Sequence, residues 1–424
     1  MVDRTLTPEF RQVEQIQLIK AEPYVLANNV KLYVVNGGDQ ELIRIELVFK
    51  NVNWTSAKPL QAYTVNSMLT EGTSKLSSQQ IAEKIDYYGA FLQMDYNYDY
   101  STVTLFTLTK HLEATLPVIK AIITDSVFAE TELETFKTNQ KQKLLVSLEK
   151  NDYLGRRLFN NVLFGDTIYG YKTESFDYNR LDRSQLLEYF HSAYQPSNCT
   201  IIASGKVTES SVKLIDAFFG QDWEKGTDAV PNLFSFASDK GTEHYVERAD
   251  ALQSAIRLGK LTVNRAHEDF PGLQVLNTVL GGYFSSRLMA NIREDKGYTY
   301  GIGSAIVSLQ NAGYFVIGSE VGADVCTAAI NEIEKEIKTL QTELIPQEEL
   351  QLVRNYMMGS LLGSLENALS HADKFKNILF SGLTYEYYNQ YINIVKNISA
   401  EHLQQLAIKY LDFNDLEKVI IGKR

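Results

Sequence analysis

The chain has 424 residues, of which 44% are hydrophobic and 22% are charged, and its formal net charge is −11 at pH 7. This length exceeds one ordinary hydrophobic core, so we expect a soluble globular protein of two or three domains. The acidic balance argues against the basic face that a nucleic-acid binder needs, and it gives no reason to expect an anionic membrane as partner. No apolar run reaches the ~20 residues of a membrane-spanning helix.

The cysteines and the N-terminal residues bear on the cellular compartment. Cys199 and Cys326 lie far apart in apolar surroundings. We expect two buried free thiols rather than a disulfide, which fits a reducing compartment. Residues 1–17 contain neither the apolar core nor the cleavage signature of a secretory signal. The expected location is therefore cytoplasmic.

The first half of the chain predicts both strands and helices. The segment LIRIELVFK at 42–50 alternates apolar and polar residues, as a half-buried strand does. Ser77, with Gln80 three residues later, has the spacing of a capping box at a helix start. The predicted strands are two short runs within 24–36 around the turn at Asn28 and Asn29, then 42–50, 91–96, 101–108 and 199–203. The predicted helices are 60–69, 77–88, 112–124, 130–149, 153–163 and 183–193.

The second half repeats this order of elements. Its predicted strands are 254–261, a strand beginning at 298–300, 312–320 and 417–422. Its predicted helices are 272–280, a short piece around 288–292, 327–340, 347–365, 368–380 and 399–410.

Two pairs of segments indicate an internal duplication. Residues 181–206 line up with 398–423, since each is an amphipathic helix ending in tyrosine, then a turn, an apolar strand and Gly-Lys. The sequence NSMLTEG at 66–72 likewise parallels NTVLGGY at 277–283. A repeat this long indicates two homologous domains rather than a solenoid. We predict domains at 1–220 and 243–424, joined by a linker at 221–242. The class is α+β, with a mostly antiparallel sheet and clustered helices in each half.

The most informative stretch is GGYFSSRLMANIREDKGYTYGIG at 281–303. Leu288 and Ile292 sit four apart on one face of a predicted helix, and Gly297 is suited to the left-handed turn that ends it. A strand begins at the following tyrosines. This reversal can bring Arg293 close to Tyr300, so that a cation and a phenol donor face one acceptor on a ligand.

The sequence resembles the pitrilysin/insulinase family of zinc peptidases, in the form with two tandem domains per subunit that includes mitochondrial processing peptidase. Three stretches carry the resemblance over nearly the whole chain. They are YFHSAYQPSN at 189–198 with Gly205 after it, AYTVNSMLTEGTSKLSS at 62–78, and the stretch at 281–303. The last of these is similar to the signature of the family's second domain.

That family binds zinc through an inverted His-x-x-Glu-His motif on a first-domain helix, with a later glutamate as third ligand. The matching positions here are Tyr63, Asn66 and Ser67, and the third position falls near Leu144. Tyrosine and serine are poor zinc ligands at neutral pH, and asparagine cannot take a proton from water. No two of the chain's six histidines lie within four residues of each other. We therefore expect no metal or other cofactor in this chain.

The family's second-domain arginine and tyrosine hold the substrate backbone and stabilise the charge that develops on the scissile carbonyl. The matching Arg293 and Tyr300 are both present. In heterodimeric members one subunit carries zinc and the other carries this pair. The resemblance implies a zinc-less subunit that is inactive alone, with a homologous zinc-binding partner and a peptide or unfolded polypeptide as substrate. Gly281 and Gly282 are candidates for close approach of that substrate.

Plainer interpretations stay open for each of these residues. Arg293 can be an exposed cation at a helix end, and Tyr300 can be an ordinary strand aromatic. Gly281 and Gly282 can form a simple turn. The whole chain can also be an inert structural or assembly subunit, as some relatives in respiratory complexes are, or a peptide-binding homodimer.

Overall fold

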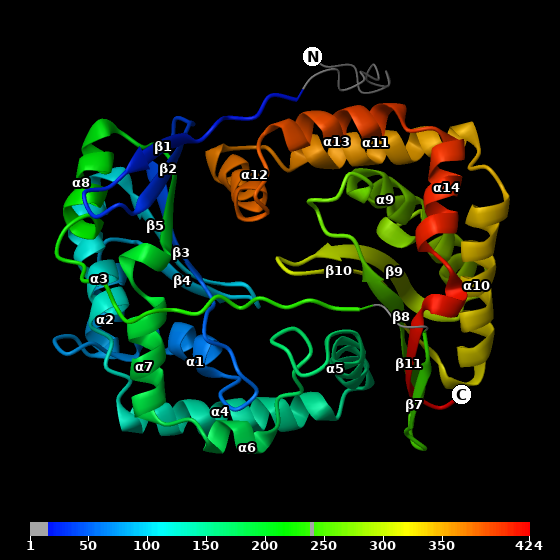
Figure 1. Cartoon of the computed structure of the whole chain (residues 1–424), viewed down its shortest axis with the longest axis horizontal. Helices are drawn as coiled ribbons and strands as arrows, with labels where there is room; N and C mark the ends of the chain where they lie inside the picture. Colours follow the sequence, from blue (N-terminus) through cyan, green and yellow to red (C-terminus); the bar gives the residue numbers. More distant parts are fainter. Residues whose placement is uncertain (1–15, 238–240) are drawn as a thin grey trace, which may run out of the picture.

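A computed structural model describes residues 16–237 and 241–424. Most of the N-terminal segment assessed for a secretory signal lies outside these residues. Each half of the described chain contains one sheet with helices around it (Figure 1). The fold class predicted from the sequence is confirmed. None of the described helices combines the length and apolarity that crossing a membrane requires.

The first sheet has six strands in the order β1-β2-β6-β3-β5-β4. All neighbouring pairs are antiparallel except β2 and β6. The strands are β1 Glu22–Val25, β2 Lys31–Asn36, β3 Leu42–Lys50, β4 Phe91–Tyr96, β5 Tyr100–Leu108 and β6 Cys199–Gly205. The helices are α1 Gln61–Met68, α2 Ser78–Asp86, α3 Leu112–Thr124, α4 Glu130–Leu148, α5 Asn151–Phe164, α6 Ser175–Asn179, α7 Arg183–Ala193 and α8 Glu209–Phe219.

The second sheet has five strands in the order β7-β11-β8-β10-β9, with only β7 and β11 parallel. This is the order and sense of β2-β6-β3-β5-β4, as expected for a duplicated unit. The strands are β7 Glu243–Glu247, β8 Gln253–Thr262, β9 Thr299–Ser308, β10 Gly313–Gly322 and β11 Glu417–Gly422. The helices are α9 Phe270–Asn277, α10 Cys326–Thr342, α11 Gln347–Gly363, α12 Ala368–Phe380, α13 Glu386–Asn397 and α14 Ala400–Tyr410, with π-helical turns at Thr278–Gly282 and Met289–Asp295.

Four elements were not predicted, and two predicted helices have different shapes. Helix α6 has only five residues, and β7 exposes most of its side chains, so neither has a periodic pattern. Helix α13 was also missed. Helix α8 was missed although Thr208 and Ser211 form a capping box before it. The helix predicted at 272–280 ends earlier, at Asn277, and continues as a π-helical turn; the piece around 288–292 is also π-helical.

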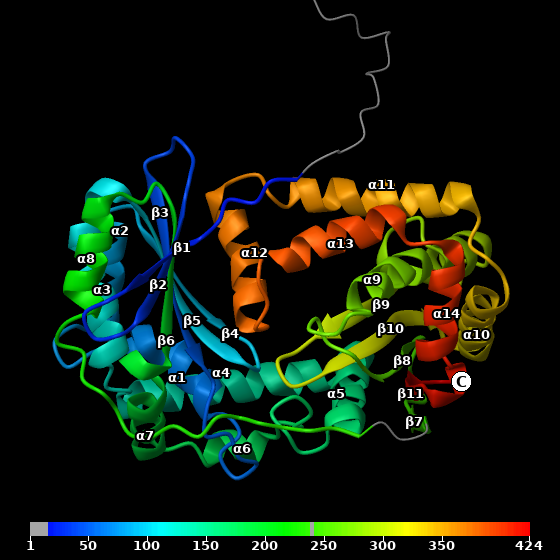
Figure 2. The ribbon, with the colours of Figure 1, turned by 45° about the horizontal axis from the view of Figure 1, so that its top comes forward.

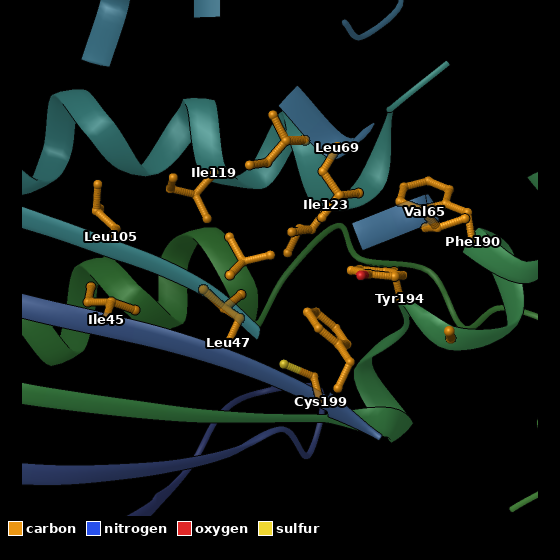
Figure 3. Packing of buried hydrophobic residues seen from close by; sticks show 14 of the residues in the cluster. Ile45, Leu47, Val65, Leu69, Leu105, Ile119, Ile123, Phe190, Tyr194 and Cys199 are labelled. Atoms are coloured by element: carbon orange, nitrogen blue, oxygen red, sulfur yellow. The ribbon is translucent and has the colours of Figure 1, made fainter. Parts of the chain in front are cut away.

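The core of the first half lies between its sheet and α1, α3 and α7. Figure 3 shows Val65 and Ile119 from the helices near strand residues such as Leu47, all of them fully buried. Both cysteines are free and buried, as the sequence predicted, and burial raises the pKa of each thiol.

One helix of each half packs on the sheet of the other half. Helix α5 packs on β8 and β11, where Phe159 and Phe164 join Ala255 and Val419 in one apolar cluster. Helix α12 packs on β2 and β6, where Phe375 lies in a cluster with residues of both strands. Both views show α12 beside the first sheet and α5 beside the second (Figures 1 and 2). The two halves are thus joined through buried apolar surface and not only through the segment at 221–242.

Ion pairs also join α12 and α5 to the sheets on which they pack. Arg44 on β3 is 7% exposed and binds Asp373 of α12 at 2.8 Å, while its neighbour Glu46, 3% exposed, accepts a hydrogen bond of 2.5 Å from Lys376. Arg44 also pairs with Glu46 at 2.9 Å. In the other half, Arg257 of β8 pairs with Asp152 of α5.

The two halves also meet at the tips of two hairpins. Asp99, between β4 and β5, accepts hydrogen bonds from the Tyr169 hydroxyl at 2.5 Å and from the backbone amide of Gln310 at 3.0 Å. The side-chain amide of Asn311 donates to the same Tyr169 oxygen at 2.9 Å. Burial raises the pKa of Asp99, and the hydrogen bonds from Tyr169 and Gln310 oppose the shift.

Replacing Tyr169 with Phe is expected to lower the free energy of unfolding by about 1–3 kcal/mol at pH 7, because Asp99 and Asn311 lose a buried partner. The Tyr169 hydroxyl stabilises the charged form of Asp99, so the variant raises the pKa of that carboxyl further. A raised carboxyl pKa contributes stability that is present at low pH and lost as the pH rises. Urea denaturation should therefore show a smaller difference near pH 4 than at pH 7. A difference that is equal at both pH values would contradict this assignment.

Candidate functional site

The stretch at 281–303 contains a π-helical turn and leads into the first part of β9, the edge strand of the second sheet. The π-helical turn Met289–Asp295 leads into Gly297, whose φ of +67° is the left-handed conformation predicted for it. The chain then enters β9, the edge strand of the sheet. The backbone amide of Tyr298 donates to the Ile292 carbonyl at 3.0 Å and closes this reversal. Both candidate residues are therefore held by short, well-connected segments.

Tyr300 lies at an irregularity in the pairing of β9 with β10. Thr299 pairs with Val321 and Ile302 pairs with Ser319, so two residues of β9 oppose the single residue between them on β10. The Thr299 hydroxyl fixes this bulge by donating to the Glu320 carbonyl at 2.6 Å. Bulges redirect side chains, and they are common beside active sites. Tyr300 is 92% exposed and lines a cavity of about 520 Å³ over β8, β9 and β10.

Arg293 lies near the end of the π-helical turn and is about one-third exposed. Its guanidinium lies over the Phe284 ring at 4.7 Å and is 4.0 Å from a Glu294 carboxylate oxygen. The stacking restricts the side chain without consuming its hydrogen-bond donors, since a cation over a ring face interacts through the ring quadrupole. A carbonyl or carboxylate of a ligand can still accept from this group.

No hydrogen bond or other described contact joins Arg293 to Tyr300, and they do not line a common cavity among those described. Their convergence on one ligand acceptor stays a prediction. Both residues belong to the segment 281–303, and the hydrogen bond from the Tyr298 amide to the Ile292 carbonyl closes the chain reversal between them.

Gly281 has a packing reason to be glycine, whereas Gly282 is exposed and leaves a tight but less restrictive space for a Cβ. A Cβ at Gly281 would lie 2.5 Å from the Ser304 hydroxyl oxygen and 2.7 Å from its backbone nitrogen. A Cβ at Gly282 would lie 3.1 Å from the Asn277 side-chain nitrogen. Gly281 is buried against β9. The contact with substrate that the sequence predicted for these glycines remains a prediction.

The positions that match the zinc motif lie on α1. Tyr63 and Ser67 are one turn apart and partly exposed, and the Tyr63 hydroxyl donates to the Gln140 side-chain oxygen at 3.2 Å. Gln140 lies on α4, one helix turn before Leu144, which is 5% exposed. Gln140 and Phe136, whose ring lies 6.0 Å from that of Tyr63, are thus the α4 residues with a described contact to Tyr63. Sequence spacing alone could not choose between neighbouring turns of α4.

Asn66 is a structural residue. It is 1% exposed, its amide donates to the Asp95 carbonyl of β4 at 2.9 Å, and its oxygen accepts from the Tyr194 hydroxyl at 3.0 Å. Asn277, at the repeat-related position, donates in the same way to the Ser304 carbonyl of β9 at 3.2 Å. In both halves this asparagine ties a helix to the edge strand, so its amide is not available to activate water.

Replacing Asn66 with Ala is expected to lower the free energy of unfolding by about 2–3 kcal/mol, because a buried hydroxyl and a buried carbonyl lose their partner. Thermal or urea denaturation measures the loss. Tyr63→Phe, which removes one partly exposed hydroxyl from the same helix, serves as control and should change stability by less than about 1 kcal/mol. Equal effects of the two substitutions would show that Asn66 is not the anchor of α1.

The residues on this face of α1 do not fit a zinc ion. Zinc in proteins is held by thiolate, imidazole or carboxylate groups, and the groups here are a phenol, a hydroxyl and a glutamine amide. Burial raises the pKa of Tyr63, which disfavours the phenolate that a metal would need. Across 16–237 and 241–424, no group of three or more His, Cys, Asp or Glu is placed to hold a metal ion.

Comparison with known proteins agrees with the fold and with the signature. Residues 180–357 match the family described as "Peptidase M16 inactive domain". The "Uncharacterized zinc protease YmxG" of Bacillus subtilis is 28% identical over 353 residues, which cover 82% of this chain and 84% of that protein. The "Non-peptidase homolog YmxG" of Helicobacter pylori is 22% identical over 366 residues, covering 84% and 83%.

Two solved structures have the same fold. The peptidase M16 inactive domain protein from Pseudomonas fluorescens superposes with a TM-score of 0.87 at 20% identity, covering 95% of this chain and 98% of that one. A protease from Helicobacter pylori also gives a TM-score of 0.87, at 17% identity, covering 96% and 100%. The resemblance to the zinc-peptidase family is therefore confirmed: residues 180–357 match an M16 family model, and the whole chain shares the fold of M16 proteins.

Proposed function

We propose that this chain is the non-metal-binding subunit of a two-chain zinc peptidase. The observation that carries the proposal is the contrast between its two candidate sites. The α1 face holds a phenol, a hydroxyl and amides where zinc ligands are needed. The second half presents Tyr300, 92% exposed on a bulge, and an arginine whose donors are not consumed. A homologous partner supplies zinc and activates water, and this chain supplies the substrate-positioning groups.

The names of related proteins support the absence of a complete site. The Helicobacter pylori relative is called a non-peptidase homolog, and the matched family is described as an inactive domain. The Bacillus subtilis relative is called a zinc protease, so the proposal rests on this chain's own residues: none of Tyr63, Asn66 and Ser67 is a zinc ligand.

The chemical role follows from the two side chains. When a peptide lies against β9, Arg293 donates to a backbone carbonyl and holds the chain in place. The Tyr300 hydroxyl donates to the oxygen that becomes negative as water attacks the scissile carbonyl, as an oxyanion-hole donor does. Zinc on the partner supplies the Lewis acid and the nucleophile. Asn66, at the position of the family's general base, does not take a proton from water.

Assembly tests the proposal first. A homologous chain with an intact His-x-x-Glu-His motif, encoded in the same genome, should form a one-to-one complex with this chain in sedimentation-velocity ultracentrifugation. The homodimer of this chain, if it forms alone, should give way to the mixed complex. Two chains that sediment independently at concentrations of about 10 μM would contradict a stable heterodimer.

A further inference from the structure

Another cavity of the second half is lined by residues that have no role in the proposed catalysis. It has a volume of about 460 Å³ and lies among α9, α11, α12 and α13. This volume is typical of pockets for small organic ligands. Its walls combine aromatic and aliphatic side chains, such as Phe270, Met357 and Tyr391, with hydroxyl and amide groups, such as those of Gln274, Ser360 and Asn377.

Two cations also line this cavity, Arg265 from the loop before α9 and Lys374 from α12. Within the described chain neither of them forms an ion pair, and no lining residue of the cavity is an acid. The nearest acid in sequence, Asp373, is engaged instead by Arg44 at 2.8 Å. The Arg265 Nε is buried without a hydrogen-bond partner, and the guanidinium lies 6.0 Å from the Tyr387 ring centroid.

The two cations repel each other in partly buried positions. Burial lowers the pKa of Lys374 and the charge of Arg265 lowers it further, while the charge of Asp373 opposes the shift without reversing it. Burial also raises the pKa of Tyr387 and Tyr388, and that of Tyr391 to about 12, so these three phenols do not supply a negative charge at pH 7. A bound anion would satisfy the Arg265 donor and offset the repulsion.

We propose that this cavity binds the carboxylate end of an apolar peptide, with Arg265 and Lys374 on the carboxylate and the aromatic walls on the adjoining side chains. The anionic group fits the cations, the aromatic and aliphatic part of the lining suits apolar side chains, and the hydroxyl and amide groups suit a peptide backbone. Arg265 and Asn377 also border a cavity of about 730 Å³ between the β4–β5 and β9–β10 hairpins, so the two cavities adjoin each other. The peptide nature of the ligand rests on the proposed function.

Titration calorimetry on the purified full chain tests this site with three probes. They are N-acetyl-Phe-Leu-Phe with a free carboxylate, the same peptide as its amide, and inorganic phosphate. The free acid should bind at least tenfold more tightly than either of the others, since it alone has both the charge and the apolar body. Arg265→Gln and Lys374→Met should each weaken the free acid about tenfold or more and leave the amide unchanged.

Arg156→Gln is the matched control, because Arg156 also lies 6.0 Å from a tyrosine ring, that of Tyr153, and lines none of the described cavities. It should bind the free acid like the unaltered chain. Equal binding of acid and amide, tighter binding of phosphate, no binding of the free acid, or an equal loss in the control would each overturn the proposal. No partner or zinc is present in these titrations, so their failure would leave the assembly result standing, and a failed assembly would leave a measured carboxylate site standing.

Discussion

Replacing Arg293 with Gln is expected to lower the kcat/KM of the assembled peptidase about 100-fold, with the zinc content of the complex unchanged. Arg293 is held over Phe284 and keeps its donors for a ligand. Removing one donor to a developing oxyanion or a substrate carbonyl costs about 2.7–4 kcal/mol in comparable sites, which corresponds to roughly 100- to 1000-fold. Tyr300→Phe removes a single hydroxyl from an exposed position and should lower kcat/KM about 10- to 100-fold without changing stability.

Two substitutions on the same segment serve as matched controls. Lys296→Gln removes an exposed cation three residues after Arg293, and Tyr298→Phe removes a hydroxyl from a partly buried tyrosine. Both should leave kcat/KM within about twofold of the unaltered complex. The role of Arg293 and Tyr300 would be refuted by unaltered kinetics in both of their variants, or by equal losses in the controls.

Replacing Arg44 with Met is expected to lower the free energy of unfolding by about 3 kcal/mol, the second large effect. Arg44 is 7% exposed, pairs with Glu46 at 2.9 Å and donates to the Leu369 carbonyl of α12 at 2.9 Å. Its removal leaves Glu46 buried with only Lys376, and breaking a buried ion pair on one side is strongly destabilising. Urea denaturation measures the loss, and hydrogen exchange should show faster opening of α12.

The double variant Arg44→Met with Glu46→Leu distinguishes the buried charge from the loss of packing. It removes both buried charges of β3, and Asp373 and Lys376 remain to pair with each other across 3.9 Å. Replacing a buried ion pair by apolar residues is often neutral, so most of the lost stability should return. A double variant as unstable as the single one would show that Arg44 acts through packing or its bond to Leu369, not through the charge of Glu46.

The sequence predicted the regular elements well where a pattern is dense and local. Strands β3 and β11 begin and end at the predicted residues, and Ser77 caps α2 through the predicted capping box. The prediction that β3 is half-buried was wrong, because both of its faces are covered. The repeat of 181–206 at 398–423 predicted two similar sheets, since the same pattern of helix, turn and strand folds in the same way. The resemblance also predicted Arg293 and Tyr300 as site residues from the sequence alone.

The features that depend on distant contacts could not be predicted. The apolar faces of α5 and α12 predict buried helices, and they do not say that each helix packs on the sheet of the other half. The bulge at Tyr300 arises from the register of two strands, and Gln140 faces Tyr63 because two helices cross. Arg265 and Lys374 line one cavity although they lie more than a hundred positions apart in the sequence. Neither segment contains a motif that would predict this.

Zinc content and peptidase activity, measured for the pure chain and again after adding a partner with an intact zinc motif, test the central claim most directly. We expect no stoichiometric zinc and no cleavage from the chain alone, because Tyr63, Ser67 and Gln140 do not fit the metal. The mixture should hold one zinc per pair and cleave peptides at a rate that neither chain reaches alone. Stoichiometric zinc with cleavage by the pure chain, or full activity of the partner without it, would contradict the account.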